Sequence, residues 1–281
     1  MKLMRIGNLG SEKPAILLDD GTIADLSLIV DDIASEAISP SGLEKIRQTN
    51  LNSLPKLDTN ERIGACVGNS SKFIGIGLNY ADHAAEAGLD VPPEPIMFMK
   101  ATTCICGAND DIIMPPNSKK LDWEVELGIV IGTKGSYIKE ENALDHVAGY
   151  CVINDISERE NQIERAGQWV KGKSADTFGP IGPYLVTKDE IADPQNLKLW
   201  LEVDGKKMQN GTTKTMAYGV KHLVHYVSQF MTLLPGDIIA TGTPPGVGMG
   251  KKPEAIFLRA GQKMRLSVEG LGEQNQKIVA G

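Results

Sequence analysis

The stretch DWEVELGIVI (residues 122–131) places two acids in a segment that otherwise has the pattern of a buried β-strand. Because side chains alternate along a strand, Glu124 and Glu126 should share one face, and the apolar residues between and after them should share the other. Two carboxylates two positions apart lie roughly 7 Å from each other by strand rise, so they could hold one cation. The alternative is an edge strand with a solvated acidic face. The acid pair alone leaves both interpretations open.

A third acid ends another apolar run. The segment GYCVIND (residues 149–155) has the pattern of a strand that ends on Asp155, after which Ser157 could cap a helix beginning at Glu158. Strand ends that open into helices often hold ligands, although Asp155 could instead only stabilise the helix start. Three carboxylates without a His or Cys cluster would suit Mg²⁺, Mn²⁺ or Ca²⁺, because hard cations take oxygen ligands.

A candidate base lies in GLNYADHAAEAG (residues 77–88), where an apolar strand gives way to a turn and a short alanine-rich helix. His83 and Glu86 are three positions apart and would share a helical face. A carboxylate beside an imidazole raises the basicity of the ring, as a water-activating base near neutral pH requires. The alternative is a surface His–Glu pair. The other histidines, His146, His222 and His225, are expected to be structural or solvated.

Two glycine-rich stretches remain, KGKSADTFGP (residues 171–180) and TGTPPGVG (residues 241–248). Neither has the spacing of a phosphate-binding P-loop or of a dinucleotide-binding turn. Both could let backbone N–H groups and a hydroxyl approach a small carboxylate, and the alternative is a pair of tight connections.

Most of the expected elements are strands. Short apolar runs bounded by Gly, Pro or Asn predict them at residues 73–77, 96–99, 124–131, 149–154, 197–203, 237–241, 263–268 and 276–279. The clearest helix is predicted at residues 218–231, where apolar residues recur at helical spacing. Because strands do not alternate regularly with helices, we expect a mixed, mostly antiparallel β core and not a doubly wound parallel sheet.

The first 65 residues are expected to form a small β-rich domain. Two apolar runs flank Asp19-Asp20-Gly21, which is a hairpin signal, and a short helix capped by Ser41 follows. Residues 50–55 and 58–61 have the composition of a linker. We therefore divide the chain into an N-terminal domain of residues 1–65 and a main domain of residues 66–281.

Composition excludes several classes of protein. The 281 residues carry a net charge of −7 without a basic patch, which argues against nucleic acid as a partner. The start of the chain lacks the apolar core of a signal peptide, and no window offers about 18 uninterrupted apolar residues, so we expect a cytoplasmic protein without a membrane partner. The four cysteines have neither zinc-site nor disulfide-scaffold spacing and should be reduced and buried.

Taken in order, these motifs resemble the fumarylacetoacetate hydrolase family from about residue 72 to residue 280. The matching residues are His83 and Glu86, Glu124 and Glu126, Asn154-Asp155 with Arg159 and Gln162, Lys173-Ser174 with Asp176-Thr177, and the loop of residues 241–248. Ala175 and Gly179 depart from the family pattern, where Phe and Cys are frequent. These departures affect the expected shape of the pocket and leave the catalytic assignments intact.

The resemblance implies an α+β, mostly β protein with a mixed β-roll or β-sandwich core and few helices. It also implies a dimeric enzyme that acts on 2-oxo or 2,4-diketo acids with Mg²⁺, or alternatively Mn²⁺. The implied metal ligands are Glu124, Glu126 and Asp155; the catalytic residues are His83, Glu86 and Lys173; and the substrate-binding residues are Arg159, Gln162, Gly242 and Thr243.

Within the family, the full-length pattern, including GLGEQ (residues 270–274), is most similar to bacterial hydrolases of 2,4-diketo-3-deoxy sugar acids of the rhamnonate or fuconate type, which yield pyruvate and lactate. Alternatives in the same family are a 2-oxo acid decarboxylase, a diene-dioate isomerase and a ureidoglycolate lyase. A non-catalytic, metal-stabilised binding protein is an alternative of another class.

Overall fold

The computed structural model describes residues 1–58, 60–82 and 90–281, and strands form most of its regular structure. The strands are β1 (Lys2–Ile6), β2 (Lys13–Leu17), β3 (Ile23–Asp25), β4 (Lys56–Leu57), β5 (Phe73–Gly77), β6 (Ile96–Lys100), β7 (Ile105–Gly107), β8 (Ile112–Met114), β9 (Leu121–Asp122), β10 (Val125–Ile131), β11 (Val147–Asn154), β12 (Ser157–Glu158), β13 (Gly179–Ile181), β14 (Leu185–Thr187), β15 (Lys198–Val203), β16 (Lys206–Thr212), β17 (Ile238–Ala240), β18 (Lys263–Val268) and β19 (Glu273–Ala280). The α-helices of the described residues are α1 (Pro40–Arg47), α3 (Val170–Lys173) and α4 (Val220–Phe230), and Glu160–Glu164 form a π-helix. The expectation of a mostly β protein with few helices is confirmed.

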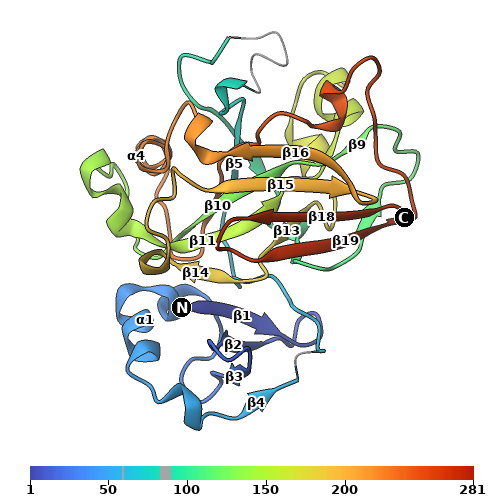
Figure 1. Cartoon of the computed structure of the whole chain (residues 1–281). Coiled ribbons are helices and arrows are strands. Elements are labelled where there is room, and N and C mark those ends of the chain that lie inside the picture. The colour runs from blue at the N-terminus through green and yellow to red at the C-terminus, as the bar shows by residue number, and fades with distance from the viewer. Residues whose placement is uncertain (59, 83–89) are drawn as a thin grey trace.

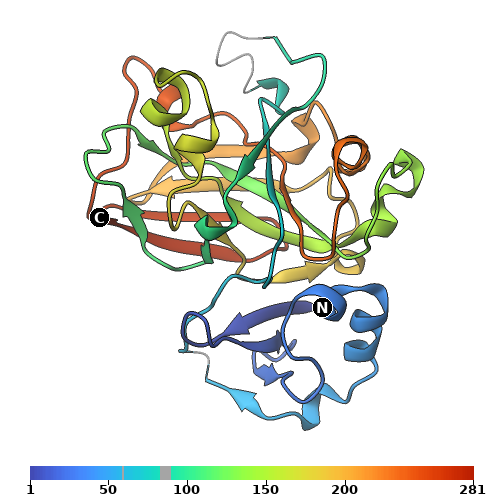
Figure 2. The ribbon, with the colours of Figure 1, turned by 180° about the vertical axis from the view of Figure 1, so that it is seen from behind.

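The largest sheet joins the first strands of the chain to its centre. Its order is β4-β3-β2-β1-β14-β11-β10-β17-β5-β6, with β13 and β7 attached beside this path. Strand β1 pairs with β14, where Leu3 lies opposite Leu185. In Figure 1, β1 to β4 and α1 form the blue lower unit, and Figure 2 shows the same division from behind. This strand pair therefore carries the main sheet into the N-terminal unit.

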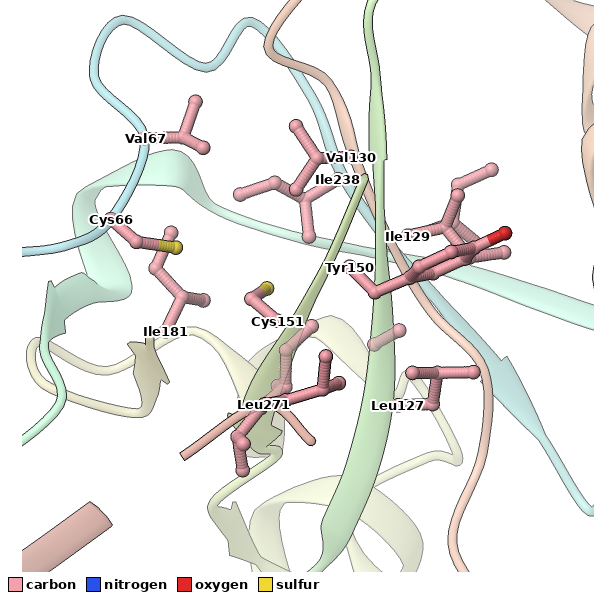
Figure 3. Packing of buried hydrophobic residues seen from close by; sticks show 14 of the residues in the cluster. Cys66, Val67, Leu127, Ile129, Val130, Tyr150, Cys151, Ile181, Ile238 and Leu271 are labelled. Carbon is pink, nitrogen blue, oxygen red and sulfur yellow. The ribbon is translucent and has the colours of Figure 1, made fainter. Parts of the chain in front are cut away.

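Strands β10 and β11 form the centre of the core, and every residue of both strands is buried. A second sheet of order β16-β15-β18-β19-β8 packs against them. Figure 3 shows Leu127 and Ile129 beside Tyr150 on one side of the strands, and Val130 beside Ile238 on the other. Because β10 is paired along both edges and covered on both faces, the solvated acidic edge strand is excluded.

Most strand pairs are antiparallel, and β7–β13, β5–β17 and β8–β19 are parallel. The expected mixed, mostly antiparallel core is therefore confirmed. The predicted strands at residues 73–77 and 263–268 coincide with β5 and β18, and the predicted helix at residues 218–231 contains α4. Among the described residues, no helix has both the length and the apolar character needed to cross a membrane.

Two local predictions are wrong. Ser157 does not cap a helix, because Ser157 and Glu158 pair with β9 as a strand, and the π-helix starts only at Glu160. Helix α1 is capped by Ser39 and not by Ser41, because Pro40 occupies its first position and the Ser39 hydroxyl accepts a hydrogen bond from the Gly42 N–H. Strand β4 lies between the two stretches predicted as a linker and pairs with β3.

Candidate metal centre and active site

Three buried carboxylates converge at one end of β10 and β11. Each of Glu124, Glu126 and Asp155 offers an oxygen atom, and these three oxygens lie within 4.8 Å of one another. The antiparallel register sets Val125 opposite Asn154, so the residue before β10 and the residue after β11 become neighbours. The Asp155 N–H accordingly donates to the Glu124 carbonyl at 2.9 Å. Oxygens spaced in this way could surround a hard cation with ligand distances of about 2.0–2.6 Å.

Buried cationic side chains surround the three acids. The ammonium of Lys173, at the end of α3, donates to Glu124 Oε2 and to Asp155 Oδ2, each at 2.7 Å. Lys100, the last residue of β6, donates to Asp155 Oδ1. Arg159 Nη2 donates to Glu124 Oε1 at 2.7 Å. These contacts orient the carboxylates of Glu124 and Asp155.

The charge balance of the cluster favours a bound cation. Within the part of the chain that the structure describes, the buried ionisable groups of this centre are four acids and three bases: Asp122, Glu124, Glu126, Asp155, Lys100, Arg159 and Lys173. When all of them are ionised, one negative charge is in excess, which favours a cation among the carboxylates; a divalent ion would leave one positive charge for an anionic ligand. The residues present therefore fit a divalent metal.

The pKa values of the two glutamates move in opposite directions. Burial raises the pKa of Glu124, but the charges of Lys173 and Arg159 outweigh burial and lower it to about 2. Burial, followed by the charges of Asp155 and Glu124, raises the pKa of Glu126 well above its ordinary value. Glu126 is thus the acid whose ionised form most needs a compensating cation.

The glycine-rich loop of residues 241–248 lies along β10. The Gly242 N–H donates to Glu126 Oε2 at 2.8 Å, and Gly242 has a φ of +94°, which favours glycine. The Thr243 hydroxyl donates to the Val125 carbonyl at 2.9 Å and accepts a hydrogen bond from Gln209 Nε2 at 2.7 Å. This loop therefore helps to position the acid pair. The Thr243 hydroxyl proton is engaged in the hydrogen bond to the Val125 carbonyl.

Arg159 and Gln162 come from the segment that follows Asp155. Arg159 Nε donates to Asp122 Oδ2 at 2.8 Å, and Arg159 Nη1 donates to Gln162 Oε1 at 2.9 Å. Gln162 lies in the π-helix, and short π-helical turns are frequent at functional sites. Both side chains line the same cavity as the acid pair. Their predicted role in holding a substrate carboxylate stays a prediction.

His83 and Glu86, the predicted base, lie outside the described residues. The chain that leads to them is tied to the site, because the Asn79 amide donates to the Thr241 carbonyl at 2.7 Å and to the Tyr218 carbonyl at 3.0 Å. The catalytic role of the His83–Glu86 pair stays a prediction.

Sequence reasoning missed several residues of the centre. Asp122 accepts hydrogen bonds from the backbone N–H groups of Gly248 and Met249, at 2.6 Å and 3.0 Å, in addition to its pair with Arg159. Asp122 is the first residue of the stretch 122–131, two positions before Glu124, and this position could have indicated that it belongs to the acid cluster. Lys100 had a weaker signal, a lone lysine at the end of an apolar strand.

The acid pair opens into a cavity of about 320 Å³, which is within the size range of small-molecule sites. Lys173, Arg159, Gln162 and Thr243 line it together with apolar side chains. A cavity with an oxygen-ligand metal centre and a charged lysine can bind a carboxylate or an oxo group and stabilise negative charge on it.

Residues 72–279 match the family model of the fumarylacetoacetate (FAA) hydrolase C-terminal domain. The chain belongs to the fumarylacetoacetate hydrolase family. A relative from Burkholderia orbicola, described in general terms as a hydrolase, is 61% identical over 277 residues, which is 99% of this chain and 98% of the relative.

Solved structures of the family share the whole fold. A fumarylacetoacetate hydrolase from Exiguobacterium antarcticum is 36% identical with a TM-score of 0.88, and the match covers 100% of both chains. A maleylpyruvate hydrolase from Sphingobium sp. SYK-6, solved with a manganese(II) ion and pyruvate, is 26% identical with a TM-score of 0.83, again over 100% of both chains. These similarities support an enzyme of the hydrolase and isomerase type found in this family.

Proposed function

We propose that the protein is a divalent-metal-dependent hydrolase that cleaves the bond between carbons 3 and 4 of a 2,4-diketo acid. Water supplies the hydroxyl that completes the new carboxylic acid from carbon 4, and a proton goes to carbon 3, which becomes the methyl group of pyruvate. The observation that carries the proposal is the convergence of three buried carboxylates beside the Lys173 ammonium, where Glu124, Glu126 and Lys173 line one cavity.

The carboxylates of Glu124, Glu126 and Asp155 would hold Mg²⁺ or Mn²⁺. The bound cation supplies Lewis-acid stabilisation of the negative charge that develops on the pyruvate unit. Burial lowers the pKa of Lys173, but Asp155 and Glu124 outweigh burial and raise it overall, which keeps the ammonium charged. Lys173 can therefore stabilise the same developing charge. In this proposal, His83, oriented by Glu86, removes the proton from the attacking water.

Arg159, Gln162 and the Gly242–Thr243 turn would orient the acid end of the substrate. Arg159 acts mainly through Glu124 and Gln162, because its guanidinium donates to those residues and to Asp122. The acyl end is the open part of the proposal: the sequence resemblance favours the hydroxylated chain of a rhamnonate- or fuconate-type diketo acid. A homodimer and a cytoplasmic location are further proposals from the same resemblance and from the sequence.

The test is an assay of pyruvate release from a panel of acylpyruvates with Mg²⁺ or Mn²⁺. Release should stop with EDTA and return with metal, and His83→Ala and Glu126→Gln should each lower kcat by at least about 10². Glu141→Gln is the matched control, because its side chain is 74% exposed. Pyruvate release that survives metal removal or the loss of His83 would contradict the mechanism. Release of CO₂ would identify a decarboxylase, and a rearranged acid of unchanged mass would identify an isomerase.

A further inference from the structure

Beyond the charged groups, the cavity has an apolar side. We call four of its residues the apolar wall: Phe98, Ile163, Trp169 and Met249. Ile163 and Met249, which line the cavity, are 46% and 43% exposed. Large apolar side chains that remain exposed in a concave site release water when an apolar group covers them.

The two aromatic residues of the wall, Phe98 and Trp169, pack against glycines of β5. A Cβ atom at Gly75 would lie 2.2 Å from the Phe98 ring, and one at Gly77 would lie 2.4 Å from the Trp169 ring. Both rings therefore pack directly on the strand, in space that any other residue would fill. The two rings also touch each other, with centroids 5.2 Å apart and planes inclined by 59°. Neighbouring glycines and mutual contact fix the position of this surface.

The apolar wall lies directly beside the charged groups of the cavity. Lys173 Nζ lies 5.3 Å from the centre of the Phe98 ring, within the range of a cation–π contact. Trp169 is the residue immediately before α3, and Lys173 is the last residue of that helix. One short helix thus presents an aromatic ring and the ammonium to the same cavity. A ligand whose acid end contacts Lys173 would lay the rest of its carbon skeleton along the wall.

Within the described residues, several polar groups that line the cavity already have hydrogen-bond partners in the protein. The Thr243 hydroxyl donates to Val125, and the Arg159 guanidinium donates to Asp122, Glu124 and Gln162. Hydroxyl groups buried against the wall would lose their hydrogen bonds to water without replacement, which is unfavourable. An apolar acyl group has no such cost.

We infer that the substrate carries a bulky apolar acyl group, of the size of a phenyl ring or a branched alkyl chain, and not the hydroxylated chain of a sugar acid. This inference rests on the proposed function for the chemistry at the acid end of the substrate. It changes the substrate class that the sequence resemblance favours.

The first test compares kcat/KM for pyruvate release from three substrates of the metal-loaded protein. They are 4-phenyl-2,4-dioxobutanoate, a 2,4-diketo-3-deoxy sugar acid, and an acylpyruvate whose acyl group ends in a carboxylate. The phenyl substrate should be preferred by at least about tenfold. The third substrate tests Lys252, an exposed lysine that also lines the cavity. A preference for the sugar acid or for the dicarboxylate would overturn the inference.

A pair of variants links this preference to the wall. Ile163→Ser should reduce the ratio of kcat/KM between the phenyl and the sugar-acid substrates by about fivefold or more, because it removes apolar contact area from the cavity. Ile113→Ser is the matched control, since Ile113 is 40% exposed on β8 and does not line the cavity. Equal changes of the ratio in both variants, or no change in Ile163→Ser, would contradict the role of the wall.

Equilibrium binding separates this inference from the proposed reaction. If no diketo acid is cleaved, the proposed hydrolase fails, and calorimetry with Mg²⁺ then compares phenylpyruvate with a hydroxylated 2-oxo acid of similar size. Phenylpyruvate should bind with a Kd at least about tenfold lower. Equal or weaker binding of phenylpyruvate would overturn the apolar acyl site, whatever reaction the protein performs.

Discussion

Glu126 and Glu124 are neighbours on one strand end, yet their surroundings differ. Glu124 contacts Lys173 and Arg159, whereas the hydrogen bond to Glu126 within the described residues comes from the neutral N–H of Gly242. A buried acid with a cationic partner stabilises the fold, and a buried acid without one is costly while it is ionised. The two glutamates should therefore respond differently to the same substitution.

We predict that Glu126→Gln leaves the metal-free protein as stable as the parent within about 1 kcal/mol, because the amide removes an unfavourable buried charge and can still accept from Gly242. Glu124→Gln should cost about 1.5–3 kcal/mol, because Lys173 and Arg159 each lose the charge of one of their two carboxylate partners. Urea unfolding in EDTA measures both. Equal losses in the two variants would contradict the assigned difference.

The same variants report on the metal. In the parent protein, Mn²⁺ at about 100 times its Kd should add about 2.7 kcal/mol of stability. Glu126→Gln should abolish most of this gain without destabilising the metal-free form, and thermal unfolding with and without Mn²⁺ measures the difference. A full gain in Glu126→Gln would mean that the ion lies elsewhere.

At the scale of elements, Gln209 links the second sheet to strand β10 and to the glycine-rich loop of the site. It lies on β16 with 1% of its surface exposed, its Oε1 accepts from the Val125 N–H at 3.0 Å, and its Nε2 donates to Thr243 and to the Pro244 carbonyl. Val125 stands between the two glutamates. One glutamine therefore sets the distance between the acid-bearing strand and the glycine-rich loop.

We predict that Gln209→Met costs about 1–3 kcal/mol, because the buried Val125 N–H loses its acceptor. Mn²⁺ affinity, measured by calorimetry, should fall as well, since the acid pair is no longer held against the loop. Asn210→Met, at an exposed position of the same strand, is the control. If Gln209→Met loses stability but keeps the parent Kd for Mn²⁺, Gln209 supports the fold and does not position the site.

Sequence patterns predicted individual strands better than they predicted how distant segments pair. Apolar runs such as residues 73–77 are local signals, and they coincide with observed strands. The helix expected after Asp155 was wrong because residues 157 and 158 pair with β9, and a pairing partner some 35 residues away leaves no local pattern. Lys100 was missed for the same reason: its contact with Asp155 depends on how distant strands are arranged.

At the scale of the whole molecule, a chain of ion pairs connects the N-terminal unit to the rest. Glu12 pairs with Arg62 at 2.9 Å, and Arg62 pairs in turn with Asp110 at 2.6 Å. Burial raises the pKa of Glu12, but hydrogen bonds from Arg62 and from the backbone, together with the charge of Arg5, outweigh it and lower the pKa below its ordinary value. A carboxyl whose pKa is lower in the folded protein stabilises the fold while it is ionised.

We predict that Glu12→Gln lowers the free energy of unfolding by about 1 kcal/mol at pH 7. The contribution of Glu12 is complete above the pKa of the unfolded chain and is lost as the pH falls through the lower pKa of the folded state, so the difference between parent and variant should shrink as the pH falls below 5. Urea unfolding at pH 7, 5 and 3 measures it. A difference that stays constant over this range would show that the charge of Glu12 is not responsible.

The pairing of β1 with β14 has a consequence for synthesis of the chain. Strand β1 leaves the ribosome about 180 residues before its partner does. Throughout that interval, the outer edge of β1 presents unpaired N–H and C=O groups to the cytosol of the translating cell, and such an edge invites pairing with another nascent chain. Truncated translation products that end before residue 185 should therefore associate or recruit chaperones, whereas chains released after β14 has emerged should stay apart.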